Sequence, residues 1–147
     1  MRLMALDVGQ RRVGVALSDP EERIAYAHAT LRRGNLTSDL AALAQMVEDE
    51  GIDLVVVGLP RSLDGTLGPQ AERIQRFGAV LAERLAVPVV YWDERLSTVA
   101  ALRALREAGH SGRAVKGRVD ETAAMLILEG YLAYRRNLGQ TETRGTT

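Results

Sequence analysis

The sequence contains no cysteine among its 147 residues, so disulfide bonds, thiolate metal ligands and cysteine nucleophiles are excluded. No apolar run approaches the roughly 18 residues of a membrane-spanning helix. The N-terminus also lacks the basic and apolar regions of a secretory signal. Ser18, Ser62 and Ser97 lie in no G-x-S-x-G turn of the serine hydrolases. These absences predict a soluble, cytoplasmic protein without a membrane partner.

The sequence also lacks a net charge, because nineteen basic residues balance nineteen acidic ones. It therefore shows no overall basic character of the kind that tight nonspecific binding to nucleic acid requires. Lys116 is the single lysine, and every other basic residue is arginine. Arginine is well suited to forked contacts with phosphate oxygens, although a genome rich in G and C favours the same bias.

Apolar residues make up 46% of the sequence, enough to build the core of one domain. Their spacing predicts strands at 2–8, 13–18, 24–31, 53–59 and 87–92, and helices at 37–50, 69–86, 97–109 and 119–136. Thr37 or Ser38 is the expected N-cap of the first helix. This βββαβαβαα order predicts an α/β protein with a mixed five-stranded sheet and helices on both faces, which is the order of the ribonuclease H-like fold. The domain would span 1–138, with a disordered tail at 139–147 that has no apolar anchor.

Acidic residues occur at the ends of three predicted elements. Asp7 ends the first strand, Asp93 and Glu94 follow the last strand, and Asp120 opens the last helix. Carboxylates that converge from different elements are the ligands with which two-metal nucleases hold Mg²⁺ or Mn²⁺. Each acid also has a structural alternative: Asp7 binding turn amides near Gly9, Asp93 and Glu94 forming a surface turn, and Asp120 stabilising its helix through the dipole.

A loop follows the buried strand 53–59, with the sequence GLPRSLDGT at residues 58–66. Ligands of open α/β sheets usually bind at the carboxyl ends of the strands, where this loop begins. The candidate contacts for a phosphate backbone are the backbone amides of the loop, Arg61 and Ser62. Asp64 and Gly65 would fix the curvature of the loop. The alternative is that its glycine and proline only shape a turn.

Four segments in order resemble the motifs of one known family, over about residues 2–136. They are DVGQRRVGVALSD, VVVGLPRSLDGT, DERLSTVAA and KGRVDETAAMLILEGYL. The family is the bacterial YqgF group, also called RuvX. Its members are ribonuclease H-fold proteins described as Holliday junction resolvases and as nucleases that mature the 5′ end of precursor 16S ribosomal RNA.

The resemblance implies a cytoplasmic endonuclease that uses Mg²⁺ or Mn²⁺ on structured RNA or branched DNA. Asp7, Glu94 and Asp120 become the expected catalytic, metal-binding carboxylates, with Asp93 as the alternative to Glu94. The expected nucleic-acid contacts are Arg12, Arg61, Ser62, Arg95, Lys116 and Arg118. Resolution of a four-way junction would also imply a homodimer, since it needs two active sites at a fixed spacing.

Two other functions are compatible with parts of this pattern. A catalytically silent nucleic-acid-binding factor in ribosome assembly would keep the acidic residues for structure, and the zero net charge suits weak binding. A phosphotransferase of the actin and sugar-kinase type also begins with D-x-G and a further glycine, but such enzymes clamp ATP between two copies of the fold, and 147 residues hold one. The sequence leaves the choice between RNA and DNA open.

Overall fold

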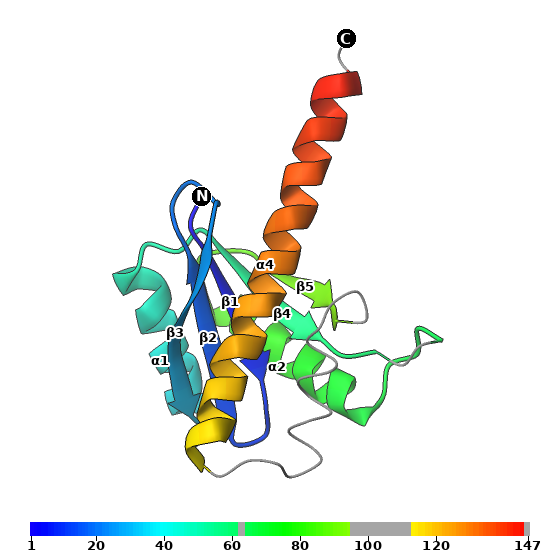
Figure 1. The fold of residues 1–147 in the computed structure, drawn as a ribbon. Coiled ribbons are helices and arrows are strands. Elements are labelled where there is room, and N and C mark those ends of the chain that lie inside the picture. The colour runs from blue at the N-terminus through cyan, green and yellow to red at the C-terminus, as the bar shows by residue number, and fades with distance from the viewer. Residues whose placement is uncertain (62–63, 95–112, 146–147) are drawn as a thin grey trace.

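The computed structural model describes residues 1–61, 64–94 and 113–145, with the backbone alone at 113–121 and 140–145 (Figure 1). Its strands are β1 (Leu3–Val8), β2 (Arg12–Ser18), β3 (Ala25–Arg32), β4 (Leu54–Leu59) and β5 (Val89–Asp93). Its helices are α1 (Leu36–Asp49), α2 (Pro69–Arg84) and α4 (Arg113–Gly145). The helix predicted at 97–109 lies outside the described residues. None of the described helices is long and apolar enough to span a membrane.

The five strands form one mixed sheet in the order β3-β2-β1-β4-β5. The first three strands are an antiparallel meander, and β1, β4 and β5 run parallel to one another. Every residue of β1 and β4 is buried, as expected for central strands covered on both faces. Because the three parallel strands point the same way, their carboxyl ends meet at one edge, which we call the carboxyl edge.

Helices cover both faces of the sheet, which confirms the predicted architecture (Figure 1). The larger core joins one face to α1 and α2, through residues such as Leu43, Ile74 and Leu81. The smaller core joins the other face to α4, through Ala123, Ala124 and Ile127. Alternate residues of each strand point to opposite faces, so each side chain of β1 belongs to one core or the other.

The N-cap of α1 differs from the prediction. Asn35 caps the helix, and its Oδ1 accepts a hydrogen bond of 2.8 Å from the backbone N–H of Ser38. Ser38 instead donates its hydroxyl to the carbonyl of Asn35 at 3.1 Å. Asparagine is as good a cap as serine, and Asn35 satisfies a free amide of the first turn.

Helix α4 is longer than predicted at both ends. It begins at Arg113 rather than near 119, and it continues to Gly145 rather than ending near 136. Figure 1 shows its C-terminal half projecting past the end of the sheet. The backbone of the predicted tail is thus helical as far as Gly145, while the division of the chain into a domain and a disordered tail stays a prediction.

Candidate active site at the carboxyl edge

Asp7 lies near the carboxyl end of β1 and is 1% exposed. It shares a face with Leu3 and Ala5, which pack in the core beneath α4. Its partner across β2 is Gly14. On the other side Gly58 is level with it, since the preceding residues Leu6 and Val57 are paired. The residues level with Asp7 on both neighbouring strands are therefore glycines, which carry no side chain.

Glu94 follows β5 directly and is 2% exposed. A methyl group added at Gly58 would overlap the Oε1 atom of Glu94 and the Cδ1 atom of Ile127 in α4. The Glu94 carboxylate therefore lies over the backbone of Gly58, beneath α4. Asp7 and Glu94 thus lie on the same face of the sheet and at the same edge.

Asp93 and Glu94 differ in their surroundings, a difference that the sequence left open. Trp92 packs in the core beneath α4, so alternation along β5 places Asp93 on the face of α1 and α2. Asp93 is also half-buried, whereas Glu94 is buried. Of the two acids, only Glu94 lies on the face of Asp7.

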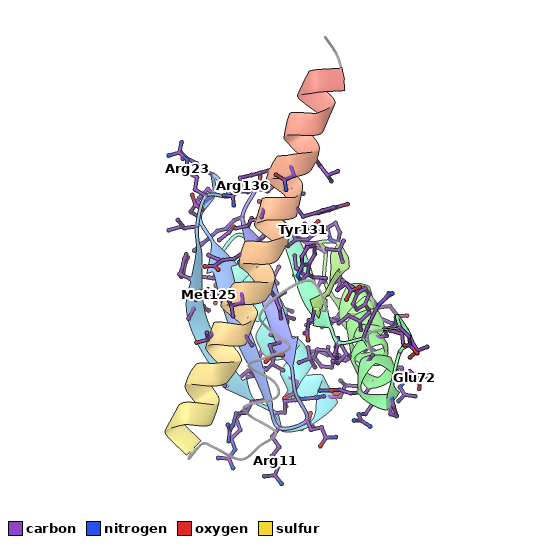
Figure 2. All side chains as sticks on the ribbon, turned by 45° about the vertical axis from the view of Figure 1, so that its right-hand side comes forward. Arg11, Arg23, Glu72, Met125, Tyr131 and Arg136 are labelled. Carbon is purple, nitrogen blue, oxygen red and sulfur yellow. The ribbon has the colours of Figure 1, made fainter. Side chains whose placement is uncertain are left out.

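Arg12 brings a positive charge to the same face and edge. It is half-buried at the start of β2 and alternates with Gly14 and Ala16, the latter in the core beneath α4. Figure 2 shows its neighbour Arg11 at the tip of the turn between β1 and β2, pointing away from the body of the protein. A cationic side chain at this position suits the binding of a phosphate, although the role of Arg12 stays a prediction.

Asp120 belongs to α4, and its side chain lies outside the described residues. Its backbone precedes the buried Ala123 and Ala124 by about one helical turn. Lys116 and Arg118 lie in the same first part of α4, where only the backbone is described. Ser62 and Arg95 lie outside the described residues altogether. The convergence of Asp120 on Asp7 and Glu94 therefore stays a prediction.

The loop between β4 and α2 has the curve expected of Asp64 and Gly65. Asp64 Oδ1 accepts hydrogen bonds from the backbone N–H of Thr66 at 3.0 Å and from its hydroxyl at 2.7 Å. Gly65 has a φ of 89°, which favours glycine. Arg61 is exposed in this loop, where solvent and a ligand can both reach it.

Two carboxylates at the site suit a hard divalent cation. Buried carboxylates are paired or coordinate a cation, and oxygen ligands are those that Mg²⁺ and Mn²⁺ prefer. Among the described side chains no three acidic or histidine residues form a metal-binding group. The expected third ligand, Asp120, is not among them. The donor chemistry of Asp7 and Glu94 therefore fits the metal.

Gly58 is a site residue whose role the sequence interpretation missed. The predicted strand 53–59 includes Gly58, as β4 does, but the prediction gave this residue no role, whereas in the structure it leaves the space that Glu94 occupies. A glycine inside an otherwise apolar strand is itself a signal of close approach by another group. That signal was present in the sequence VVVGL.

Comparisons with known proteins point to one family. Residues 1–134 match the family RuvX, described as Holliday junction resolvase. A relative from Moorella thermoacetica is 50% identical over 132 residues, which cover 90% of this chain and 94% of the relative. Another from Heliobacterium modesticaldum is 44% identical over 142 residues, covering 97% and 95%. Both carry the provisional name of pre-16S rRNA nuclease.

Solved structures support the fold independently. The Thermus thermophilus RuvC structure superposes with a TM-score of 0.56 at 13% identity, covering 93% of this chain and 97% of that one. RuvC from the same organism in complex with a Holliday junction substrate gives 0.55 at 13% identity, covering 92% and 96%. The fold is accordingly that of the RuvC-like resolvases, which confirms the predicted ribonuclease H-like class.

Proposed function

This chain belongs to the RuvX family, and on that premise we propose that it is a nuclease that hydrolyses phosphodiester bonds with the help of divalent cations. The observation that carries the proposal is the burial of Asp7 and Glu94 on one face of the sheet at its carboxyl edge. A carboxylate is costly to bury unless it is paired or binds a cation. Asp120, from α4 above this face, is the proposed third ligand.

Different residues of this chain would have different roles in the reaction. Asp7, in a rigid central strand, and Glu94, seated over Gly58, would hold Mg²⁺ or Mn²⁺ together with Asp120. The bound metal supplies an activated water and neutralises charge on the leaving oxygen. Arg12 would orient the phosphate at the same edge. In-line hydrolysis of this kind leaves a 5′-phosphate and a 3′-hydroxyl, with no covalent enzyme intermediate.

The preferred substrate of the proposal is precursor 16S ribosomal RNA, cleaved at its 5′ end. The provisional name of relatives up to 50% identical supports it. A second candidate is a four-way DNA junction, which the family description and the RuvC fold support. Junction resolution would further require a homodimer, because it needs two active sites at a fixed spacing.

Cleavage should depend on the metal. With Mg²⁺ or Mn²⁺ we expect the purified protein to cut an RNA carrying the 16S leader, a four-way DNA junction, or both, and EDTA should abolish the cutting. Gel electrophoresis of end-labelled substrates measures both rates, and matched linear RNA and duplex DNA are the controls for structure specificity. Equal cutting in EDTA would contradict the proposed metal. Binding without any cutting would favour the silent ribosome-assembly factor instead.

A pair of substitutions separates the two adjacent acids. We expect Glu94→Gln to lower the cleavage rate by about 10²-fold or more, because it removes a charge facing the metal. Asp93→Asn should keep the rate within about tenfold of the wild type, since Asp93 lies on the other face of the sheet. Single-turnover rates at saturating metal provide the comparison. The reverse order of effects would make Asp93 the ligand.

A further inference from the structure

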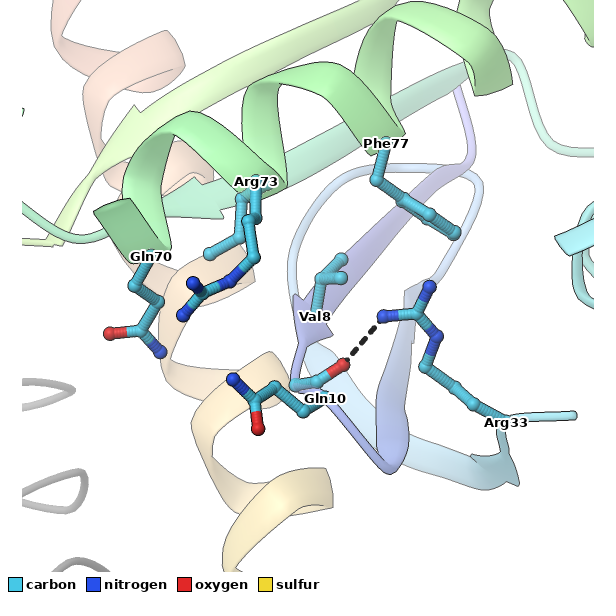
Figure 3. A pocket seen from close by; sticks show the side chains of 8 residues that line it. Val8, Gln10, Arg33, Gln70, Arg73 and Phe77 are labelled. Carbon is cyan, nitrogen blue, oxygen red and sulfur yellow. Dashed lines mark hydrogen bonds between the residues drawn. The ribbon is translucent and has the colours of Figure 1, made fainter. Parts of the chain in front are cut away.

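A pocket of about 150 Å³ opens at the carboxyl edge on the face opposite Asp7. Its walls come from the turn between β1 and β2, from the start of α2, and from Arg33 after β3. Figure 3 shows Gln70 and Arg73 of α2 on one side and Gln10 and Arg33 on the other, with Val8 between them and Phe77, further along α2, next to Arg33. A volume of this size holds several water molecules, each of which takes about 30 Å³ in the liquid.

Arg33 is held firmly in the wall of this pocket. Its Nη1 donates to the carbonyl of Gly9 at 2.9 Å, and its Nε lies 3.4 Å from Asp39 Oδ2. Its guanidinium carbon lies 4.9 Å from the centre of the Phe77 ring, a cation–π contact. Three contacts from three elements fix the guanidinium, so it presents its remaining donors without a further loss of side-chain entropy.

Arg73 carries a positive charge that no acidic residue of the described pocket lining balances. Asp39 offsets Arg33, whereas Arg73 is exposed and has no acceptor among the described side chains. The described lining contains no aspartate or glutamate, and it adds the carboxamides of Gln10 and Gln70. Two guanidinium groups and two carboxamides around a small cavity form a set of hydrogen-bond donors suited to a compact anion with several oxygen atoms.

The position of the pocket indicates which anion this is. Val8 in its floor follows Asp7 directly in β1, and the two side chains point to opposite faces of the sheet. Among the described residues, the turn after β1 lies between the pocket and the candidate active site. A strand of nucleic acid that crosses this turn would have one phosphate near Asp7 and another near Arg73.

We propose that this pocket binds a phosphate group of the nucleic-acid backbone away from the cleaved bond. The inference rests on the proposed nuclease function for the identity of the ligand, but its evidence is separate from the carboxylates. Arg73 and Gln70 are the contacting side chains from α2, and Arg33 completes the wall. The site would position the substrate without taking part in the reaction.

Arg73→Gln is the test, with Arg76→Gln as the matched control. Both substitutions remove one charge from an exposed position of α2, but Arg76 does not line the pocket. In EDTA, we expect Arg73→Gln to weaken binding of a fluorescent leader RNA by about tenfold. The slope of log Kd against log salt should also decrease by about one. Arg76→Gln should stay within about twofold of the wild type.

A second experiment tests the binding of inorganic phosphate, without nucleic acid. Phosphate at millimolar concentrations should raise the melting temperature of the wild type and of Arg76→Gln, but not that of Arg73→Gln. If phosphate binding depends on Arg73 while RNA binding does not, the pocket takes a free phosphate compound and the backbone assignment is overturned. Equal behaviour of the two variants in both arms overturns the site itself. Because neither arm measures cleavage, a failure of the nuclease proposal would be seen separately, as Arg73-dependent binding without cutting.

Discussion

Replacing Asp7 with asparagine is expected to lower the cleavage rate by about 10³-fold or more while nucleic-acid binding persists. The amide has the shape of the carboxylate but carries no charge for a cation, and removing one member of a catalytic unit disables the whole unit. Asp7 is 1% exposed, so bulk water has little access to take the place of the lost ligand. Single-turnover cleavage and anisotropy binding measure the two effects.

Asp53→Asn is the control for this substitution. Asp53 precedes β4 at the amino edge of the sheet, where its Oδ2 accepts a hydrogen bond of 2.9 Å from the backbone N–H of Arg2. It is exposed and lies at the opposite end of β4 from Gly58. We expect its cleavage rate to equal that of the wild type. If Asp7→Asn also cleaves normally, the carboxylate is structural and the catalytic proposal fails.

The architecture was predictable because the strands carry strong local signals. The fully apolar runs of β1 and β4 indicate central strands, and the helical spacing of Leu40, Leu43 and Val47 indicates the buried face of α1. The start of α4 was predicted near 119 rather than at Arg113, because glycine occurs between the predicted helices 97–109 and 119–136 and favours a loop. A glycine costs a helix about 1 kcal/mol relative to alanine, and a helix anchored by a long buried face tolerates that cost.

The candidate site was predictable in its residue types and only partly in its geometry. The positions of Asp7 and Glu94 at strand ends follow from the sequence. The position of the Glu94 carboxylate over Gly58 does not follow from the sequence, because it depends on the register of β4 with β5 and on the path of α4. The pocket of Arg33 and Arg73 was not found, since residues forty positions apart meet only after α1 and β4 have returned the chain to the carboxyl edge.

Gly58→Ala is expected to destabilise the protein and to impair cleavage together. The added methyl group would overlap Glu94 Oε1 and Ile127 Cδ1, so the carboxylate, α4 or both must move. Overpacking of a core typically costs about 1–3 kcal/mol, which for a chain of this size lowers the melting temperature by roughly 3–10 °C. A displacement of about 1 Å at a catalytic group can cost about 10²-fold in rate, so the fall in cleavage should exceed the loss of folded protein. Thermal melts and single-turnover rates below the melting transition separate the two effects.

Gly139→Ala is the control for Gly58→Ala. It tests whether the effect depends on where the methyl group is added. Gly139 is exposed in the C-terminal part of α4, and nothing lies within 4 Å of the methyl group that alanine would add there. Alanine favours a helix over glycine by up to about 1 kcal/mol, so this variant should melt at or slightly above the wild-type temperature and cleave normally. If Gly58→Ala melts and cleaves like Gly139→Ala, the space over Gly58 has no role in seating Glu94. If Gly58→Ala loses stability but keeps its full cleavage rate, Glu94 has moved without consequence, and the metal must be held by Asp7 with other acids.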